Sequence, residues 1–139
     1  MRRVLNTPEF RLVVPGKPES FRAVRAERYK RRVQEVAKSL FVSPLTGQLD
    51  VLIDYFHLRR RRMDMDNIAK CILDALTGTA YSDDVQVALQ SSVAHDLSEP
   101  VHISGCVDLV KPLAEHAEYV FIRIRHRKNP RQSDRTRLR

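Results

Sequence analysis

The sequence is poor in cysteine, with only Cys71 and Cys106 among its 139 residues. Two cysteines do not form the disulfide framework that holds small secreted domains together, which excludes that class of scaffold. Cys71 falls on the apolar face of an expected helix, which favours a reduced thiol in the core. The N-terminal stretch MRRVLNTPEF has no apolar run of signal-peptide length, and no run approaches the length of a membrane span. We therefore expect a cytoplasmic protein with no membrane association.

Aromatic residues are also scarce: there is no tryptophan, and the nine Phe and Tyr residues are scattered through the expected core positions. Proteins that read single-stranded RNA stack bases on clustered aromatic side chains. The sequence has no such cluster of aromatic residues, which argues against an RNA-binding or ribosome-associated protein.

Acidic residues are outnumbered, with 17 Asp and Glu against 25 Lys and Arg, a formal net charge of +8 and a pI near 10.0. This balance favours a polyanionic partner, with nucleic acid ahead of an anionic membrane surface. Residues 127–139 contribute +5 of the +8 and contain one apolar residue, Leu138. We expect a single domain over 1–126, followed by a basic, disordered C-terminal tail over 127–139.

Hydrophobic periodicity predicts an α+β domain with a small, mostly antiparallel sheet of about four strands and two main helices packed on one face. The expected strands cover residues 9–14, 49–58, 85–93 and 119–126. One expected helix starts at about residue 24 and ends before SPLTG (43–47), and the other covers about 66–77. Residues 94–118 are ambiguous, with a strand fragment at VHIS and a helical turn at PLAEHAE.

Each expected helix has an apolar stripe that should face the core. In the first helix the stripe consists of Ala26, Tyr29, Val33, Val36, Ala37 and Leu40. In the second helix it consists of Ile68, Cys71, Ile72, Ala75 and Leu76. Gly78 stands at the position of a C-terminal cap for the second helix.

The densest positive charge lies directly beside acidic residues, in RRRRMDMDNIAK over 59–70. If the segment is extended, Asp64 and Asp66 point to the same side and can bridge one divalent ion. If the helix begins at Asp66, then Asp66, Lys70 and Asp74 form a polar stripe opposite the core. A second acidic pair, Asp83 and Asp84, lies just beyond the helix.

Together these groups suit phosphodiester hydrolysis, because carboxylate-held Mg²⁺ activates water and neutralises phosphate charge. A lysine one turn from a ligand can stabilise the developing charge, and the absence of histidine from both clusters argues against zinc. Each residue also has a structural explanation. Asp66 can cap the helix, Lys70 can pair with a helical neighbour, and the second acidic pair can serve a turn. Spacing alone leaves both explanations open.

The stretch DMDNIAKCILDALTGTAYSDDVQV, residues 64–87, resembles the RusA family of Holliday junction resolvases. The shared pattern is Asp-x-Asp-Asn, a lysine four residues after the second Asp, Asp-Ala-Leu, a short turn, and Asp-Asp-x-Gln-Val. The resemblance implies a homodimeric α+β endonuclease that binds four-way DNA junctions. It also implies paired strand cleavage with Mg²⁺, for which Mn²⁺ is a substitute.

By position in that pattern, the resemblance implies that Asp64, Asp66 and Asp84 are the essential metal carboxylates. It implies that Lys70 is the catalytic lysine and that Asp83 is an adjacent, less critical acid. Two alternatives stay open: a nucleic-acid-binding module without catalysis, and a nuclease with broader specificity for branched DNA.

Basic residues near these acids are candidates for DNA contacts. Lys17 and Arg22 lie in a partial counterpart of the family's N-terminal basic loop. The run Arg59, Arg60, Arg61 and Arg62 is either the solvated end of a strand or a DNA-backbone contact, and we favour the contact. The chain departs from the family pattern in its longer 94–118 segment and in its basic tail.

Overall fold

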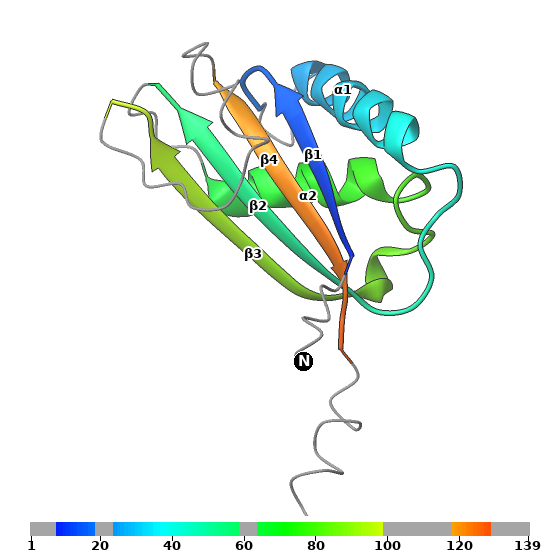
Figure 1. Ribbon diagram of the computed structural model, residues 1–139. Coiled ribbons are helices and arrows are strands. Elements are labelled where there is room, and N and C mark those ends of the chain that lie inside the picture. The colour runs from blue at the N-terminus through cyan, green and yellow to red at the C-terminus, as the bar shows by residue number, and fades with distance from the viewer. Residues whose placement is uncertain (1–7, 19–23, 59–63, 99–117, 129–139) are drawn as a thin grey trace, which may run out of the picture.

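The computed structural model describes residues 8–18, 24–58, 64–98 and 118–128 (Figure 1). The expected strand fragment VHIS (101–104), the expected helical turn PLAEHAE (112–118) except for Glu118, and most of the basic tail lie outside these residues. The described elements are β1 (Glu9–Pro15), α1 (Val24–Leu40), β2 (Leu49–His57), α2 (Met65–Leu76), the short 3-10 helix η1 (Asp84–Gln86), β3 (Val87–Asp96) and β4 (Tyr119–His126). No described helix is long and apolar enough to cross a membrane.

The four strands form one sheet in the order β1-β4-β2-β3. β4 runs antiparallel to both β1 and β2, whereas β2 and β3 are parallel. β2 and β3 are parallel because the connection between them contains α2. This helix returns the chain to the end of the sheet where β2 starts. The predicted α+β class and mostly antiparallel sheet are confirmed, with one parallel pair.

Both helices pack on the same face of the sheet, where the main core lies (Figure 1). All five residues of the predicted α2 stripe are buried. The α1 prediction is wrong at its last position, because Leu40 is 41% exposed and Phe41 is buried instead. Leu40 ends the helix, and beyond it the chain turns Phe41 against Phe10, with 5.1 Å between the ring centroids.

Two element boundaries differ slightly from the sequence prediction. α2 begins at Met65, one residue early, because Asp64 supplies the N-cap. β3 begins at Val87 and not at residue 85, since Asp84–Gln86 form the 3-10 turn that leads into it. Both differences concern acidic residues that the sequence analysis assigned to the site.

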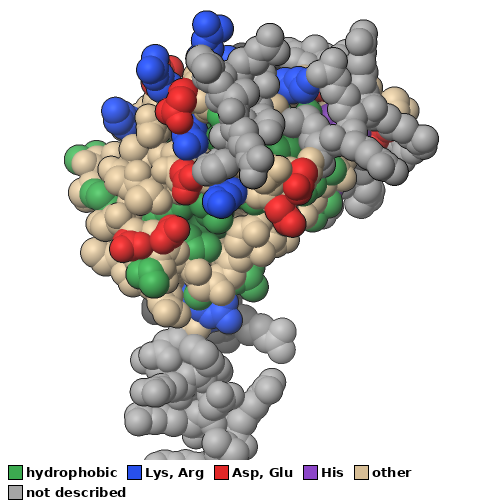
Figure 2. Space-filling model, turned by 180° about the vertical axis from the view of Figure 1, so that it is seen from behind, with side chains coloured by type: hydrophobic (Ala, Val, Ile, Leu, Met, Phe, Trp, Pro, Cys, Tyr) green, Lys and Arg blue, Asp and Glu red, His purple; other side chains and the backbone are tan. Residues whose placement is uncertain are grey.

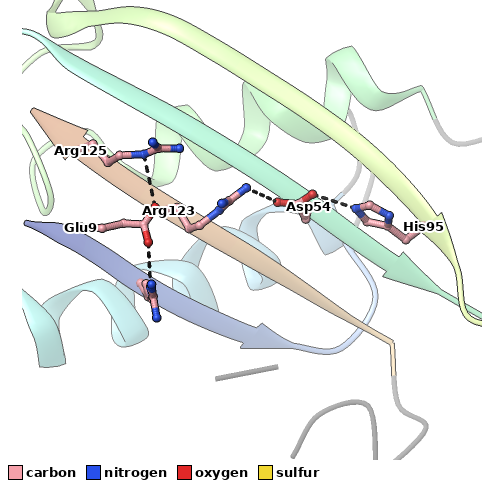
Figure 3. Close-up of polar contacts among 6 residues, drawn as sticks. Glu9, Asp54, His95, Arg123 and Arg125 are labelled. Atoms are coloured by element: carbon pink, nitrogen blue, oxygen red, sulfur yellow. Dashed lines mark hydrogen bonds and ion pairs between the residues drawn. The ribbon is translucent and has the colours of Figure 1, made fainter. Parts of the chain in front are cut away.

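The face of the sheet opposite the helices carries paired charges (Figure 3). Asp54 accepts a hydrogen bond from Arg123 at 3.2 Å and lies 2.8 Å from Nε2 of His95. Glu9 pairs with Arg11 at 2.8 Å and with Arg125 at 3.3 Å. These carboxylates therefore neutralise arginines within the sheet, which distinguishes them from the acids around α2.

Candidate active site

Asp64 forms the N-cap of α2. Its backbone is extended, and its Oδ1 accepts a hydrogen bond from the Asp66 backbone N–H at 3.0 Å. Its carbonyl oxygen accepts the first intrahelical bond, from the Ile68 N–H at 3.1 Å. The cap satisfies one of the amide donors that a helix N-terminus leaves unpaired. The structural alternative that assigned this cap to Asp66 is wrong, and residues 64–66 do not alternate as an extended strand.

Asp66, Lys70 and Asp74 lie on the exposed side of α2, opposite its buried stripe. Successive members are four residues apart, about one helical turn. Asp74 lies 3.9 Å from the Lys30 ammonium of α1. The Asp66 carboxylate accepts no hydrogen bond and forms no ion pair with the described part of the chain. The exposed stripe predicted from the sequence is confirmed, and within it Asp66 is placed to accept a ligand.

A tight turn follows α2 and leads to the second acidic pair. Gly78, just beyond the Thr77 cap, has a φ of +88°, a conformation that glycine adopts without steric cost. The buried Tyr81 hydroxyl donates to the Leu73 carbonyl at 2.7 Å. Burial raises the pKa of Tyr81, so the hydroxyl stays protonated as a donor. This turn fixes the path on which Asp83 and Asp84 lie.

Gln86 locks the acidic turn in place, a role that the sequence analysis did not assign. Its Oε1 accepts from the N–H groups of Ser82 and Asp83, at 3.0 and 3.1 Å. Its Nε2 donates to the carbonyls of Leu45 and Gly47, at 2.9 and 3.0 Å. The Asp-x-x-Gln spacing of a capping box was the sequence signal that could have identified it.

Within this turn the two acids have different environments. Asp83 Oδ1 accepts from the Val85 N–H at 3.0 Å and caps the 3-10 helix. Asp84 is exposed, and a side-chain hydrogen bond with Asp83 raises its pKa, with smaller contributions from desolvation and from the charges of Asp83 and Asp74. A carboxylate whose anion is disfavoured by neighbouring acids is typical of functional sites, and a bound cation would relieve that repulsion.

Asp64 and Asp66 lie at the start of α2, whereas Asp83 and Asp84 lie at the start of η1, beyond the turn that follows α2 (Figure 1). α2 starts on the side where β2 ends and finishes on the side where β3 starts, and its 12 residues span about 18 Å. In Figure 2, which looks onto the other side of the molecule from Figure 1, acidic side chains form separate patches with basic side chains among them. No group of three His, Cys, Asp or Glu residues in the described ranges could hold a metal. Within one chain, therefore, Asp64 lies near Asp66 and Asp83 lies near Asp84, but the two pairs do not come together.

The predicted DNA contacts fall mostly outside the described residues, as Arg22 and Arg59, Arg60, Arg61 and Arg62 do. Lys17 is described and partly exposed in the loop after β1. Arg32 of α1 supports this loop by donating from Nη1 to the Pro15 carbonyl at 3.1 Å. The sequence analysis did not assign Arg32 a role.

Residues 7–102 match the family described as endodeoxyribonuclease RusA. The match spans more than two thirds of the chain and includes α2 and both acidic pairs. The fold and this match define an enzyme that hydrolyses DNA. The chain belongs to the RusA family of Holliday junction endonucleases, which confirms the resemblance seen in the sequence. The comparison with curated proteins finds no match.

Proposed function

We propose that this protein is a Mg²⁺-dependent endonuclease that resolves four-way DNA junctions by paired phosphodiester hydrolysis in recombination and repair. The observation that carries the proposal is a pair of exposed acids in a member of this family: Asp66 follows the N-cap of α2 and Asp84 follows the N-cap of η1. Neither carboxylate has a capping role that would explain its presence in a basic chain.

The donor set fits a hard divalent cation. We assign Asp64, Asp66 and Asp84 as the metal ligands, with Asp83 as a supporting acid. These residues offer only carboxylate oxygens, which suit Mg²⁺ or Mn²⁺ and do not suit zinc. When bound, the cation would lower the pKa of a water and neutralise charge on the phosphate.

Lys70 acts beside this ligand set. It lies one helical turn from Asp66 on the same exposed side of α2. From there its ammonium stabilises negative charge that builds on the phosphate during cleavage. Its role is electrostatic, so a neutral side chain of similar length should not replace it.

A complete ligand set requires a second copy of the chain. Asp64 and Asp66 lie at the start of α2 and Asp84 lies beyond its end, so a single chain separates them by about the length of the helix, some 18 Å. We assign each site to Asp64 and Asp66 of one chain together with Asp84 of the other. A two-fold dimer then has two equivalent sites, which suits paired cuts across a junction.

DNA contacts and domain limits complete the proposal. We assign Lys17, Arg22 and the four arginines Arg59 to Arg62 as contacts to DNA phosphates. Residues 1–126 form the endonuclease domain, and the tail over 127–139 adds sequence-independent attraction to DNA. The protein acts in the cytoplasm.

The test is a cleavage assay on a labelled four-way junction and a matched linear duplex, with Mg²⁺ or with chelator. We expect symmetric, Mg²⁺-dependent nicks on the junction only, lost in Asp66→Asn and kept in Asp74→Asn, which changes another exposed acid of α2. Binding without cutting under every condition would refute the proposal. It would favour the non-catalytic DNA-binding module, in which Asp64 and Asp83 would serve only as helix caps. Equal cutting of flaps and forks would favour the broader branched-DNA nuclease.

A further inference from the structure

The outward face of α1 carries basic residues that the proposed active site does not use. On its inner side the helix buries Ala26, Tyr29, Val33 and Ala37. We define the basic face of α1 by the exposed charged residues that point away from this core. They are four bases and one acid: Arg28, Arg31, Arg32, Lys38 and Glu35. Figure 2 shows Lys and Arg side chains gathered at the upper left, over α1.

The bases of this face are not neutralised within the protein. Arg28 and Arg31 are exposed and form no ion pair with the described part of the chain. Lys30, on the side of α1 that meets α2, is different, because it lies 3.5 Å from Glu27 and 3.9 Å from Asp74. A surface with unpaired positive charge attracts a polyanion.

Arg32 extends the basic face onto the loop after β1. Its Nη1 donates to the Pro15 carbonyl, and it lies so close to Gly16 that a Cβ there would collide with it. Gly16 also has a φ of +94°, and its N–H donates to the Glu118 carbonyl at 2.9 Å. These contacts fix the loop against α1 and β4. Lys17, the next residue, therefore continues the basic face beyond the helix.

One DNA molecule can contact this face and α2 together. Both helices pack on the same face of the sheet, so both expose their outer sides in the same general direction (Figure 1). From Arg28 to Lys38 the basic face is about 15 Å long. A DNA duplex carries one phosphate charge for about every 1.7 Å of its axis. The face is therefore long enough to contact several phosphates.

We propose that the basic face of α1, together with Lys17, binds the phosphate backbone of a duplex arm of the DNA, while the strand to be cut lies at α2. The inference rests on the proposed function for its substrate. A backbone contact carries no information on base sequence, so it adds affinity and takes no part in the chemistry.

An anionic membrane suits this face less well than DNA. Helices that lie on a membrane insert an apolar side into it. The apolar side of α1 is buried in the core, and Leu40, its last residue, is its one exposed apolar residue among those whose side chains are described.

DNA binding in the presence of chelator tests the face in the full-length chain. Arg28→Gln/Arg31→Gln should weaken binding roughly tenfold, by the same factor for a labelled four-way junction and a linear duplex. The slope of log affinity against log salt should fall by about two, because two phosphate contacts are lost. Fluorescence anisotropy over a series of salt concentrations measures both effects.

Two control variants separate a local contact from net charge. Arg11→Gln/Arg125→Gln also removes two arginines, but from the face of the sheet opposite the helices, and should change affinity by less than about twofold at physiological salt. Glu35→Gln removes the acid from the basic face and should strengthen binding. Circular dichroism and thermal unfolding establish that each variant is folded.

Three results would overturn the inference. The first is wild-type affinity in Arg28→Gln/Arg31→Gln, and the second is an equal loss in Arg11→Gln/Arg125→Gln. The third is unchanged DNA affinity with loss of binding to phosphatidylglycerol vesicles, which would assign the face to a membrane.

These outcomes are separable from those of the cleavage assay. At saturating protein, Arg28→Gln/Arg31→Gln should cut a junction at the wild-type single-turnover rate, since the face contributes affinity alone. Weaker DNA binding by this variant of a protein that cuts no junction would support the basic face and refute the proposed function. Junction cleavage with no change in the variant's affinity would support the function and refute the basic face.

Discussion

Asp64 and Asp83 make the same backbone contact at the starts of two successive helices, α2 and η1. Oδ1 of Asp64 accepts from the Asp66 N–H and Oδ1 of Asp83 from the Val85 N–H, each at 3.0 Å. In both acidic motifs, therefore, the first acid caps a helix and a second acid is exposed close by. The capping explanation accounts for Asp64 and Asp83 but leaves Asp66 and Asp84 without a structural role.

Asp66→Asn should abolish cleavage without weakening the fold. The Asp66 side chain is exposed and has no polar partner within the described ranges, so the free energy of unfolding should change by no more than about 0.5 kcal/mol. Junction affinity should hold or rise, because a negative charge leaves a basic surface. Thermal unfolding, gel-shift and cleavage assays measure the three effects. Cleavage at the wild-type rate would remove Asp66 from the site.

Asp64 combines two roles that two substitutions can separate. Asp64→Asn keeps a good N-cap, whereas Asp64→Ala removes it and should destabilise the protein by about 1 kcal/mol. Both changes remove the proposed ligand, so both should abolish cleavage in Mg²⁺. Chemical denaturation and the junction assay, run in parallel on the two variants, distinguish these effects. Full activity in Asp64→Asn would show that the residue serves only as a cap.

Gln86→Ala should destabilise the protein and impair cleavage together. The change removes four hydrogen bonds and leaves the carbonyls of Leu45 and Gly47 without this donor. We expect a loss of about 1–3 kcal/mol in unfolding free energy. Gln34→Ala, at a partly exposed glutamine of α1, is the control and should change stability little. A variant as stable as the wild type would mean that Gln86 does not hold the acidic turn.

Sequence patterns predicted the elements well because their signals are local. The α2 stripe from Ile68 to Leu76 follows the helical period, and Gly78 marks its end. The parallel pairing of β2 and β3 depends on where the chain goes after α2, which residue spacing does not encode. For the same reason, the sequence analysis assigned Asp64 and Asp84 to one site but did not show that the crossover separates them within one chain. Leu40 was misassigned because periodicity does not show where a helix stops.

Asp84→Asn should stabilise the protein at neutral pH in the presence of chelator. The hydrogen bond with Asp83 raises the pKa of Asp84 in the folded state, so the folded state disfavours the anion. For such a group, stability is fully present below the ordinary aspartate pKa of about 4 and is lost as the pH rises through the raised value. Asparagine does not ionise and avoids this loss. Thermal unfolding should show a higher melting temperature for the variant at pH 7 and a smaller difference near pH 3.5. A variant less stable than the wild type at pH 7 would contradict the assignment.

Mixing two inactive variants tests whether each site draws on two chains. Asp66→Asn and Asp84→Asn should each be inactive alone. In a mixed dimer, the Asp84→Asn chain supplies intact Asp64 and Asp66 while the Asp66→Asn chain supplies intact Asp84, so one of the two sites is whole. After subunit exchange we expect about a quarter of the wild-type nicking rate, since half of the dimers are mixed and each has one intact site.

The control mixture combines Asp66→Asn with Asp64→Asn. Both changes affect the same end of α2, so no dimer in this mixture has an intact site and no activity should return. Differently tagged chains, recovered together after mixing, establish that subunits have exchanged. If exchange occurs and the first mixture stays as inactive as its components, each site lies within one chain. In that case Asp84 would have to reach Asp66 by a rearrangement of the turn that Gln86 holds.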